Sequence, residues 1–259
     1  MVLFESGKLA DKKWVNIAGL EELRGVTVEP KTIEIRALTT YTDIRRHDVI
    51  GREFPLLHQS AAVTGAIAIQ NRGTIGGNIV NASPAADSLP PLLVYEAELV
   101  LVSHDGERTV PYADFHTGYK TMNLKPGELV KSIRLPRQFT EYHHFYRKVG
   151  TRAAQAISKV CFAGVLEISG DRSRRDLSPP PIKTVRIALG SVAPVPLRAR
   201  RTEAVLTGKI ITSEMIRAAQ QTLAQEISPI DDIRSTATYR RRVAQNLLGA
   251  FLHHVELGR

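Results

Sequence analysis

The chain has 259 residues, of which 43% are hydrophobic, and a net charge of +9, a composition typical of one large globular domain or two small ones. Its apolar runs are shorter than the roughly 18 residues that a transmembrane helix needs, and no charged segment followed by an apolar stretch forms a secretory signal. We therefore expect a cytoplasmic protein without a membrane span. The single cysteine, Cys161, excludes an internal disulfide and cannot by itself hold an iron–sulfur cluster or a thiolate zinc site.

The first part of the chain, residues 1–140, combines helical and strand patterns. Apolar residues that alternate with polar ones predict half-buried strands, whereas a Thr/Asp cap and apolar residues at helical spacing predict helices. In chain order we expect a strand at 32–37, a short helix at 39–46, a helix over 54–64, a hairpin from strands 97–102 and 108–110, and a strand at 129–135 ended by Pro136. These elements predict an α+β domain with mostly antiparallel pairing.

The second part, residues 141–259, predicts a small sheet covered by helices. We expect strands in the apolar run 157–168 and in the alternating segment 185–189, separated by a polar, proline-rich loop over 170–181. Two amphipathic helices follow, one from Ser213 and one from about Ala237. The first is expected to bury Ile216, Ala219, Leu223 and Ile227, and the second to bury Val243, Leu247, Ala250 and Phe251.

Residues 71–91 contain the densest functional pattern. Gly73, Gly76 and Gly77 predict a loop whose backbone can take positive φ and approach a ligand closely. Successive N–H groups in such a loop form an anion site, and the flanking Thr74 and Asn78 add groups that bond phosphate oxygens. Ser83 followed by Pro84 predicts the start of a helix directed at this loop. The pattern therefore predicts a diphosphate site, although two glycines alone also fit a plain tight turn.

This segment resembles the second flavin-binding motif of the FAD-binding medium subunits of molybdenum hydroxylases, which include the xanthine dehydrogenase and carbon monoxide dehydrogenase flavoproteins. The resemblance extends over essentially the whole chain. It also includes the blocks 94–100, 115–121, 129–136, 146–152 and 228–236. It implies an α+β FAD-binding domain of this flavoprotein type over residues 1–140 and a small sheet-plus-helices C-terminal domain over 141–259.

The resemblance implies roles for seven residues. Thr74, Gly76, Gly77 and Asn78 match the loop that contacts the FAD diphosphate, and Asp87 matches an acid that makes a polar FAD contact. Val130 and Lys148 match an apolar contact and a lysine near the flavin, with Tyr119 as a weaker candidate. Alternatives remain for three of them. Asp87 also fits a helix-surface charge, Lys148 a lysine that extends from a strand end into solvent, and Val130 an ordinary buried strand residue.

The same resemblance implies an electron-transfer subunit. Such a subunit passes electrons from the iron–sulfur centres of a small partner subunit through FAD to NAD⁺ or another acceptor, while the molybdenum cofactor lies in a large partner subunit. The family's first flavin motif, expected just before Met1–Phe4, is missing from this sequence. We expect a truncated start, and the alternative is a docking scaffold that has lost FAD binding.

Three basic clusters and two histidine pairs add no further function. The clusters, 172–175, 198–201 and 240–242, lack any accompanying DNA-binding motif or aromatic platform. We therefore expect solvated faces or subunit contacts and no nucleic acid. Adjacent histidines such as His143 and His144 project in different directions, which makes a metal site improbable.

Overall fold

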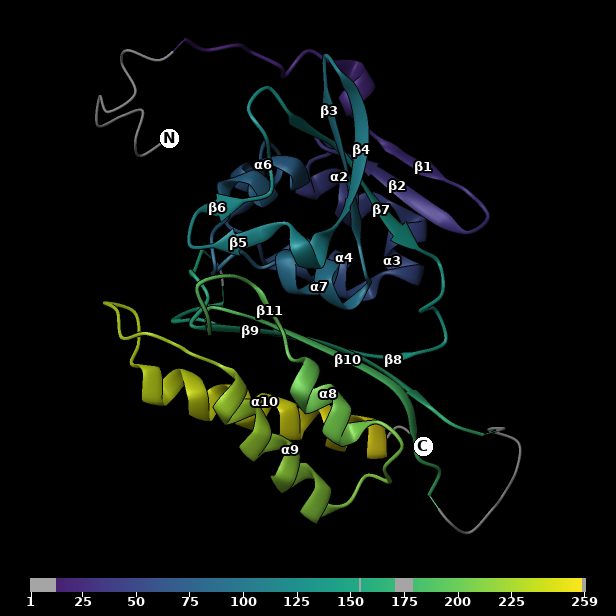
Figure 1. Cartoon of the computed structure of the whole chain (residues 1–259), viewed down its shortest axis with the longest axis vertical. Helices are drawn as coiled ribbons and strands as arrows, with labels where there is room; N and C mark the ends of the chain where they lie inside the picture. The colour runs from purple at the N-terminus through teal and green to yellow at the C-terminus, as the bar shows by residue number, and fades with distance from the viewer. Residues whose placement is uncertain (1–12, 154, 171–178, 258–259) are drawn as a thin grey trace.

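A computed structural model of the chain describes residues 13–153, 155–170 and 179–257. The basic cluster 172–175 and the residues Met1–Phe4 lie outside this part. The described chain forms two α+β units stacked one above the other (Figure 1). The first unit contains β1 (Val26–Val28), β2 (Thr32–Arg36), α2 (Tyr41–Arg46), α3 (Asp48–Glu53), α4 (Pro55–Val63), α5 (Ile67–Gln70), α6 (Ile75–Asn81), α7 (Leu89–Val94), β3 (Glu98–Ser103), β4 (Gly106–Pro111), β5 (His116–Gly118), β6 (Thr121–Met122) and β7 (Leu129–Pro136), with short 3₁₀ turns at Glu21–Leu23 and Tyr112–Asp114.

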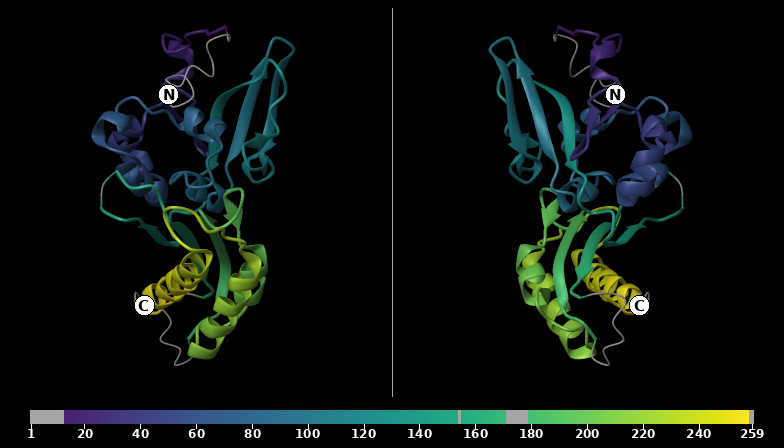
Figure 2. Two further views of the ribbon diagram at one scale, coloured as in Figure 1. Left: turned by 90° about the vertical axis from the view of Figure 1, so that its left-hand side faces the viewer. Right: turned by 90° about the vertical axis from the view of Figure 1, so that its right-hand side faces the viewer.

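The first unit is built on a five-stranded sheet in the order β1-β2-β7-β3-β4, with every neighbouring pair antiparallel. One face of this sheet packs on the helices, as the side views in Figure 2 show. The alternation of apolar and polar residues in β2 explains this arrangement, because Ile33 and Ile35 are buried while their neighbours are only partly covered. At the start of α2, Thr40 and Asp43 form a capping box that satisfies the first N–H groups.

The second unit is a four-stranded antiparallel sheet in the order β11-β10-β9-β8. The strands of this sheet are β8 (His143–Val149), β9 (Val160–Ile168), β10 (Ile182–Gly190) and β11 (Leu197–Arg198), and the unit also contains the helices α8 (Arg200–Leu206), α9 (Ser213–Glu226) and α10 (Ala237–Leu257). The predicted boundary between residues 140 and 141 lies in the connection between β7 and β8.

The second sheet is covered on both faces, which explains the continuous apolar run of β9. Phe162 and Leu166 face the helices α8, α9 and α10, whereas Ala163 and Val165 belong to the core of the first unit. The two units therefore meet directly, with α4 and α7 resting on the second sheet. No helix in the described ranges is long and apolar enough to cross a membrane.

The predicted buried face of α9 is confirmed, whereas that of α10 is wrong by about one residue. In α9, Ile216, Ala219 and Leu223 are buried, as expected. In α10 the fully buried positions are Ala244, Leu248, Phe251, Leu252 and Val255. Val243 and Leu247 lie at the edge of that face and Ala250 is exposed. Phe251 belongs to both the predicted and the observed buried face of α10. Packing against the second sheet buries the face that also contains Leu248, rather than the face that contains Val243 and Leu247.

Candidate functional site

Gly76 and Gly77 lie in the first turn of α6 and Gly73 just precedes it, so the glycines do not form the loop that we predicted. Thr74 is the N-cap of this helix, and its hydroxyl accepts a hydrogen bond from the N–H of Gly77 at 3.2 Å. None of the three glycines at 73, 76 and 77 has a positive φ. The expectation of a left-handed backbone here is therefore wrong, because the Thr74 cap and the bonds of Ile75 and Gly76 to Thr39 O and Ala37 O favour a helix at this point.

Gly76 and Gly77 play different structural roles in α6. A Cβ on Gly76 would lie 2.6 Å from the Cβ and 2.9 Å from the carbonyl oxygen of Ala37, so α6 could not approach the end of β2 as closely. Gly77 differs, because it is exposed and a Cβ there would meet only the Thr74 hydroxyl at 2.9 Å. One glycine thus permits a close backbone contact, and the other leaves an uncovered patch on the helix surface.

The backbone N–H groups at this helix start all have partners within the chain. Ile75 N–H donates to Thr39 O at 3.1 Å and Gly76 N–H to Ala37 O at 2.9 Å. Gly77 N–H is taken by the Thr74 hydroxyl, and the next amide donates to Thr74 O at 3.0 Å. A diphosphate would therefore have to be held here by side chains, because these amides already satisfy the first turn.

Two side-chain donors fit that requirement. The Thr74 hydroxyl accepts from Gly77 and keeps its own proton as a donor. The Oδ1 atom of Asn78 accepts a hydrogen bond from Ser88 Oγ at 3.1 Å. This contact identifies which end of the amide is the oxygen, so the NH₂ group is the end turned away from Ser88 and it is a donor. Both residues are only partly buried. Thr74, Asn78 and the bare surface of Gly77 therefore present the donor chemistry that phosphate oxygens need.

The predicted helix start at Ser83 and Pro84 is also wrong. Residues 83–86 form a turn in which the Ser83 hydroxyl accepts from Ala85 N–H at 3.3 Å and Ser83 O accepts from Ala86 N–H at 3.1 Å. The helix begins six residues later, at Leu89. Serine stabilises such turns as readily as it caps helices, and the two outcomes cannot be separated from a Ser-Pro pair alone.

Asp87 and Lys148 form one buried ion pair across the two units. Lys148, on β8, places its Nζ 2.7 Å from Asp87 Oδ2 and donates to Val63 O at 2.9 Å. Ser158 Oγ donates to the other carboxylate oxygen of Asp87. Both charged side chains are almost completely buried. Asp87 is thus not a helix-surface charge and Lys148 does not extend into solvent, so both alternatives stated above are excluded.

The pair is enclosed by buried groups of the chain. Burial raises the pKa of Asp87, and the charge of Lys148 with the hydrogen bonds from Lys148 and Ser158 opposes that rise. The Asp87 carbonyl accepts from Tyr146 OH at 3.3 Å and lies 3.6 Å from Cys161 Sγ. Burial also raises the pKa of the Cys161 thiol. Through Ser88, which contacts Asn78, the pair is continuous with the start of α6.

Val130 and Tyr119 do not join this group. Val130 is buried in β7 opposite Leu101 and belongs to the core of the first unit. Tyr119 is largely exposed in the turn between β5 and β6. Of the seven predicted contacts, the structure therefore gathers six in a continuous region that runs from α6 to β8, and it leaves Val130 apart.

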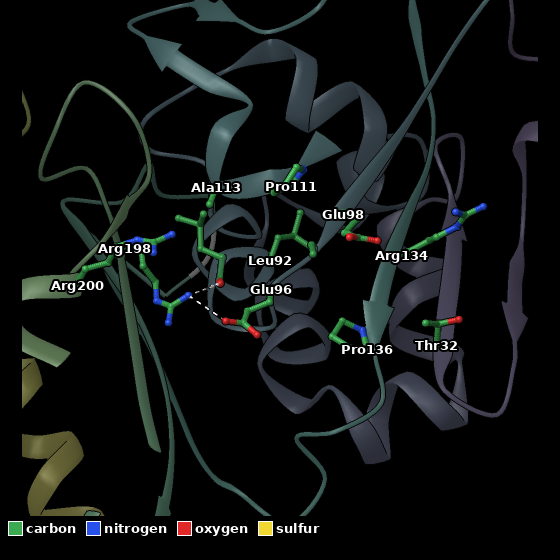
Figure 3. Close-up of a pocket in the computed structure, with 12 residues that line it drawn as sticks. Thr32, Leu92, Glu96, Glu98, Pro111, Ala113, Arg134, Pro136, Arg198 and Arg200 are labelled. Carbon is green, nitrogen blue, oxygen red and sulfur yellow. Dashed lines mark hydrogen bonds and ion pairs between the residues drawn. The ribbon is translucent and has the colours of Figure 1, made fainter. Parts of the chain in front are cut away.

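A cavity of about 410 Å³ lies elsewhere, beside the open face of the first sheet (Figure 3). Its walls come from the first sheet (β2, β3, β4 and β7), from α7 and from β11 and the start of α8, and Arg198 there donates to Leu93 O and lies 3.8 Å from Glu96. Of the described residues that line it, none is a predicted flavin contact. Arg198 is also held by Glu203, so it is neutralised within the chain.

Sequence reasoning missed the residues that complete the site. Ser158 and Ser88 bond Asp87 and Asn78 from distant segments, and isolated serines give no local signal of such contacts. Arg240 was expected on a solvated face or in a subunit contact but is buried, with hydrogen bonds to Lys159 O, Ser191 O and Asp232. The block 228–236, which resembles the family, was the available clue to this arrangement.

Sequence comparisons identify both units. Residues 1–138 match the model of the FAD binding domain in molybdopterin dehydrogenase, and residues 144–255 match the CO dehydrogenase flavoprotein C-terminal domain. The glyceraldehyde dehydrogenase medium chain of Sulfolobus acidocaldarius is 32% identical over 90% of this chain and 79% of its own length. The carbon monoxide dehydrogenase medium chain of Hydrogenophaga pseudoflava is 30% identical over 90% and 78%.

Solved structures agree with this assignment. Carbon monoxide dehydrogenase from Hydrogenophaga pseudoflava superposes with a TM-score of 0.81 at 31% identity, covering 88% of this chain and 76% of that one. The Cu,Mo-CO dehydrogenase superposes with a TM-score of 0.79 at 28% identity over 88% and 76%. The chain therefore belongs to the family of FAD-binding medium subunits of molybdenum hydroxylases, the flavoprotein subunits of oxidoreductase complexes.

Proposed function

We propose that this chain holds FAD and relays electrons from the iron–sulfur centres of a small partner subunit to NAD⁺, a quinone or another acceptor. In this proposal substrate oxidation occurs at the molybdenum cofactor of a separate large subunit. Its support is the match of the first unit to the FAD binding domain in molybdopterin dehydrogenase and of the second unit to the CO dehydrogenase flavoprotein C-terminal domain. FAD supplies the required chemistry when bound, because a flavin accepts electrons one at a time or in pairs.

The donor set at the start of α6 is the observation that carries the proposal. The Thr74 hydroxyl and the Asn78 amide would donate to the FAD diphosphate, and Gly77 would let it lie against the helix surface. These groups suit phosphate because they are donors on partly exposed side chains, with their acceptor atoms already engaged by Gly77 and Ser88. Asp87 and Lys148 would fix the second unit against this site by their ion pair.

The proposal is tested by flavin content and FAD affinity of the complex purified from its own source. Asn78→Leu removes the amide donor and should weaken FAD binding by roughly 10- to 100-fold, the loss expected for a hydrogen bond to a charged group. Asn246→Leu, at an exposed asparagine of α10 outside the segment 71–91, is the matched control and should bind FAD like the parent. Fluorescence titration of flavin-depleted complex measures both.

Two outcomes would contradict the proposal. Equal FAD affinity of Asn78→Leu and Asn246→Leu would remove α6 from the flavin site. A complete parent complex that contains no flavin would favour the alternative function, a docking scaffold that holds its partners without FAD.

A further inference from the structure

Ser88 lies at the N-cap position of α7, but its hydroxyl does not cap that helix. An N-cap serine normally accepts from the N–H of the second or third helical residue. In α7 these residues are Pro90 and Pro91, which have no N–H. The Ser88 hydroxyl lies instead 3.0 Å from Tyr41 OH and donates to Asn78 Oδ1 at 3.1 Å. It therefore joins α7 to α2 and α6.

The three residues Tyr41, Ser88 and Asn78 form a hydrogen-bonded chain that runs from the interior to the surface. Tyr41 is 2% exposed and Ser88 is fully buried, whereas Asn78 is partly exposed. The N–H of Tyr41 donates to Gly73 O at 3.2 Å, just before α6. Ser88 directly follows Asp87, whose carboxylate is held by its ion pair across the two units. Tyr41 and Ser88 are thus fixed by contacts other than those of their own hydroxyls.

The hydrogen bonds of this chain run in one direction. A serine hydroxyl has one proton, and because Ser88 gives it to Asn78 Oδ1, Tyr41 OH must donate to Ser88 Oγ. Burial raises the pKa of Tyr41, the hydrogen bond with Ser88 opposes that rise, and the charge of Asp87 adds to it. Tyr41 therefore keeps its phenolic proton at neutral pH and is the donor at the inner end of the chain.

The reverse direction is disfavoured. If the Asn78 amide were turned so that its NH₂ group donated to Ser88, Ser88 would donate to Tyr41, and the phenolic proton would need another acceptor. In the part of the chain that the structure describes, Ser88 is the one hydrogen-bond partner of Tyr41 OH. The turned amide would therefore leave a buried donor unpaired, which is unfavourable inside a protein.

The consequence is an Asn78 amide that is ordered before any ligand arrives. Its oxygen is held by Ser88, so its NH₂ group is the end left for a ligand on the surface of α6, beside the exposed Gly77. Phosphate oxygens are acceptors, and an amide turned the other way would present a second acceptor to them. An amide that is already oriented also loses less conformational entropy on binding.

We propose that Ser88 and Tyr41 are positioning residues for FAD, which hold the Asn78 amide so that its NH₂ group is presented to the diphosphate. The inference rests on the proposed function, since it deepens the role given there to Asn78. It adds two buried residues, one from α2 and one from the start of α7, that act on the cofactor through Asn78.

The test compares FAD with riboflavin, which lacks the diphosphate, in fluorescence titrations of flavin-depleted complex. Ser88→Ala releases the amide and should weaken FAD binding roughly 3- to 10-fold, the factor for one side chain that must be ordered on binding. Tyr41→Phe removes only the inner donor and should weaken it by about two- to threefold. Riboflavin affinity should not change in either variant. Ser60→Ala is the matched control, because Ser60 is an equally buried serine that bonds within α4, and it should bind FAD like the parent.

A second background separates positioning from a general structural role. In Asn78→Leu the amide is absent, so adding Ser88→Ala or Tyr41→Phe should cause no further loss of FAD affinity. Losses that add in full, or equal losses for riboflavin, would overturn the inference, because they indicate a wider disturbance of the fold. Parental FAD affinity of Ser88→Ala would also overturn it, and parental affinity of Tyr41→Phe alone would remove Tyr41 from it.

The same titrations keep the two proposals apart. If Asn78→Leu binds FAD like its control Asn246→Leu, the diphosphate site of the proposed function fails, and positioning through Asn78 fails with it. If Asn78→Leu weakens FAD binding and Ser88→Ala does not, the proposed function stands and only the positioning inference is contradicted.

Discussion

The start of α6 and the Asp87–Lys148 pair are the two polar centres of the candidate site, and they are stabilised in different ways. The helix start combines a local cap, in which Thr74 accepts from the N–H of Gly77 three residues away, with bonds from the N–H groups of Ile75 and Gly76 to the end of β2 and the residues after it. The ion pair joins residues 61 positions apart and is closed by Ser158, 71 positions from Asp87. The comparison teaches that the first centre forms within the first unit alone, whereas only the docking of two units creates the second. Variants should therefore affect the second centre more.

The largest expected effect follows from breaking the ion pair. Asp87→Ala leaves the Lys148 ammonium buried without its partner, so we expect the free energy of unfolding to fall by about 3–5 kcal/mol. Urea denaturation measures the loss. The double variant Asp87→Ala with Lys148→Met removes both charges and should be more stable than Asp87→Ala alone. If the single and double variants were equally destabilised, the pair would not behave as a buried charge couple.

The next effect is a change in the pH dependence of stability. In Lys148→Met, Asp87 keeps the burial that raises its pKa and loses the ammonium that opposes the rise. A carboxyl with a raised folded-state pKa binds more protons in the folded than in the unfolded state. Stability should therefore fall as the pH rises from about 4, by up to roughly 1.4 kcal/mol per pH unit, until the folded-state pKa is passed. The free energy of unfolding, obtained from urea denaturation at several pH values between 4 and 8, should show this slope in Lys148→Met and much less of it in the parent.

A smaller effect distinguishes the two glycines of α6. Gly76→Ala forces a methyl group against Ala37 and should destabilise by about 1–3 kcal/mol, the usual range for overpacking. Gly77→Ala adds its methyl group on the exposed side, where the gain in helix propensity of roughly 0.5–1 kcal/mol offsets the contact with Thr74. Thermal unfolding of both variants measures the difference. Equal destabilisation would mean that the close approach to Ala37 is not what requires glycine.

The smallest expected effect belongs to the cap alone. Thr74→Ala removes the acceptor for Gly77 N–H and should lower the stability by about 1 kcal/mol, whereas Thr74→Ser keeps the hydroxyl and should match the parent. Chemical denaturation of the two variants checks this. A loss several times larger would indicate that Thr74 has contacts beyond its own helix.

The fold was largely predictable because its signals are local. The alternation in β2, the capping box of α2 and the hairpin of β3 and β4 each follow from a few adjacent residues. The start of α6 was misjudged, since glycines fit both a flexible loop and a crowded helix. The contact that decides between them, with Ala37, is remote in sequence. The partnership of Asp87 with Lys148 could not be inferred, since it depends on how α4 and α7 settle on the second sheet.

The position of Cys161 makes the junction of the two units measurable. Its thiol is buried beside Tyr146 OH, at 3.4 Å, and beside the Asp87 carbonyl, and burial raises its pKa. A thiol reagent needs both access and the thiolate form, so it should react only while the segment before α7 and the strand pair β8–β9 are apart. Because the chain has no other cysteine, the rate of alkylation of the native protein reports how often the junction opens.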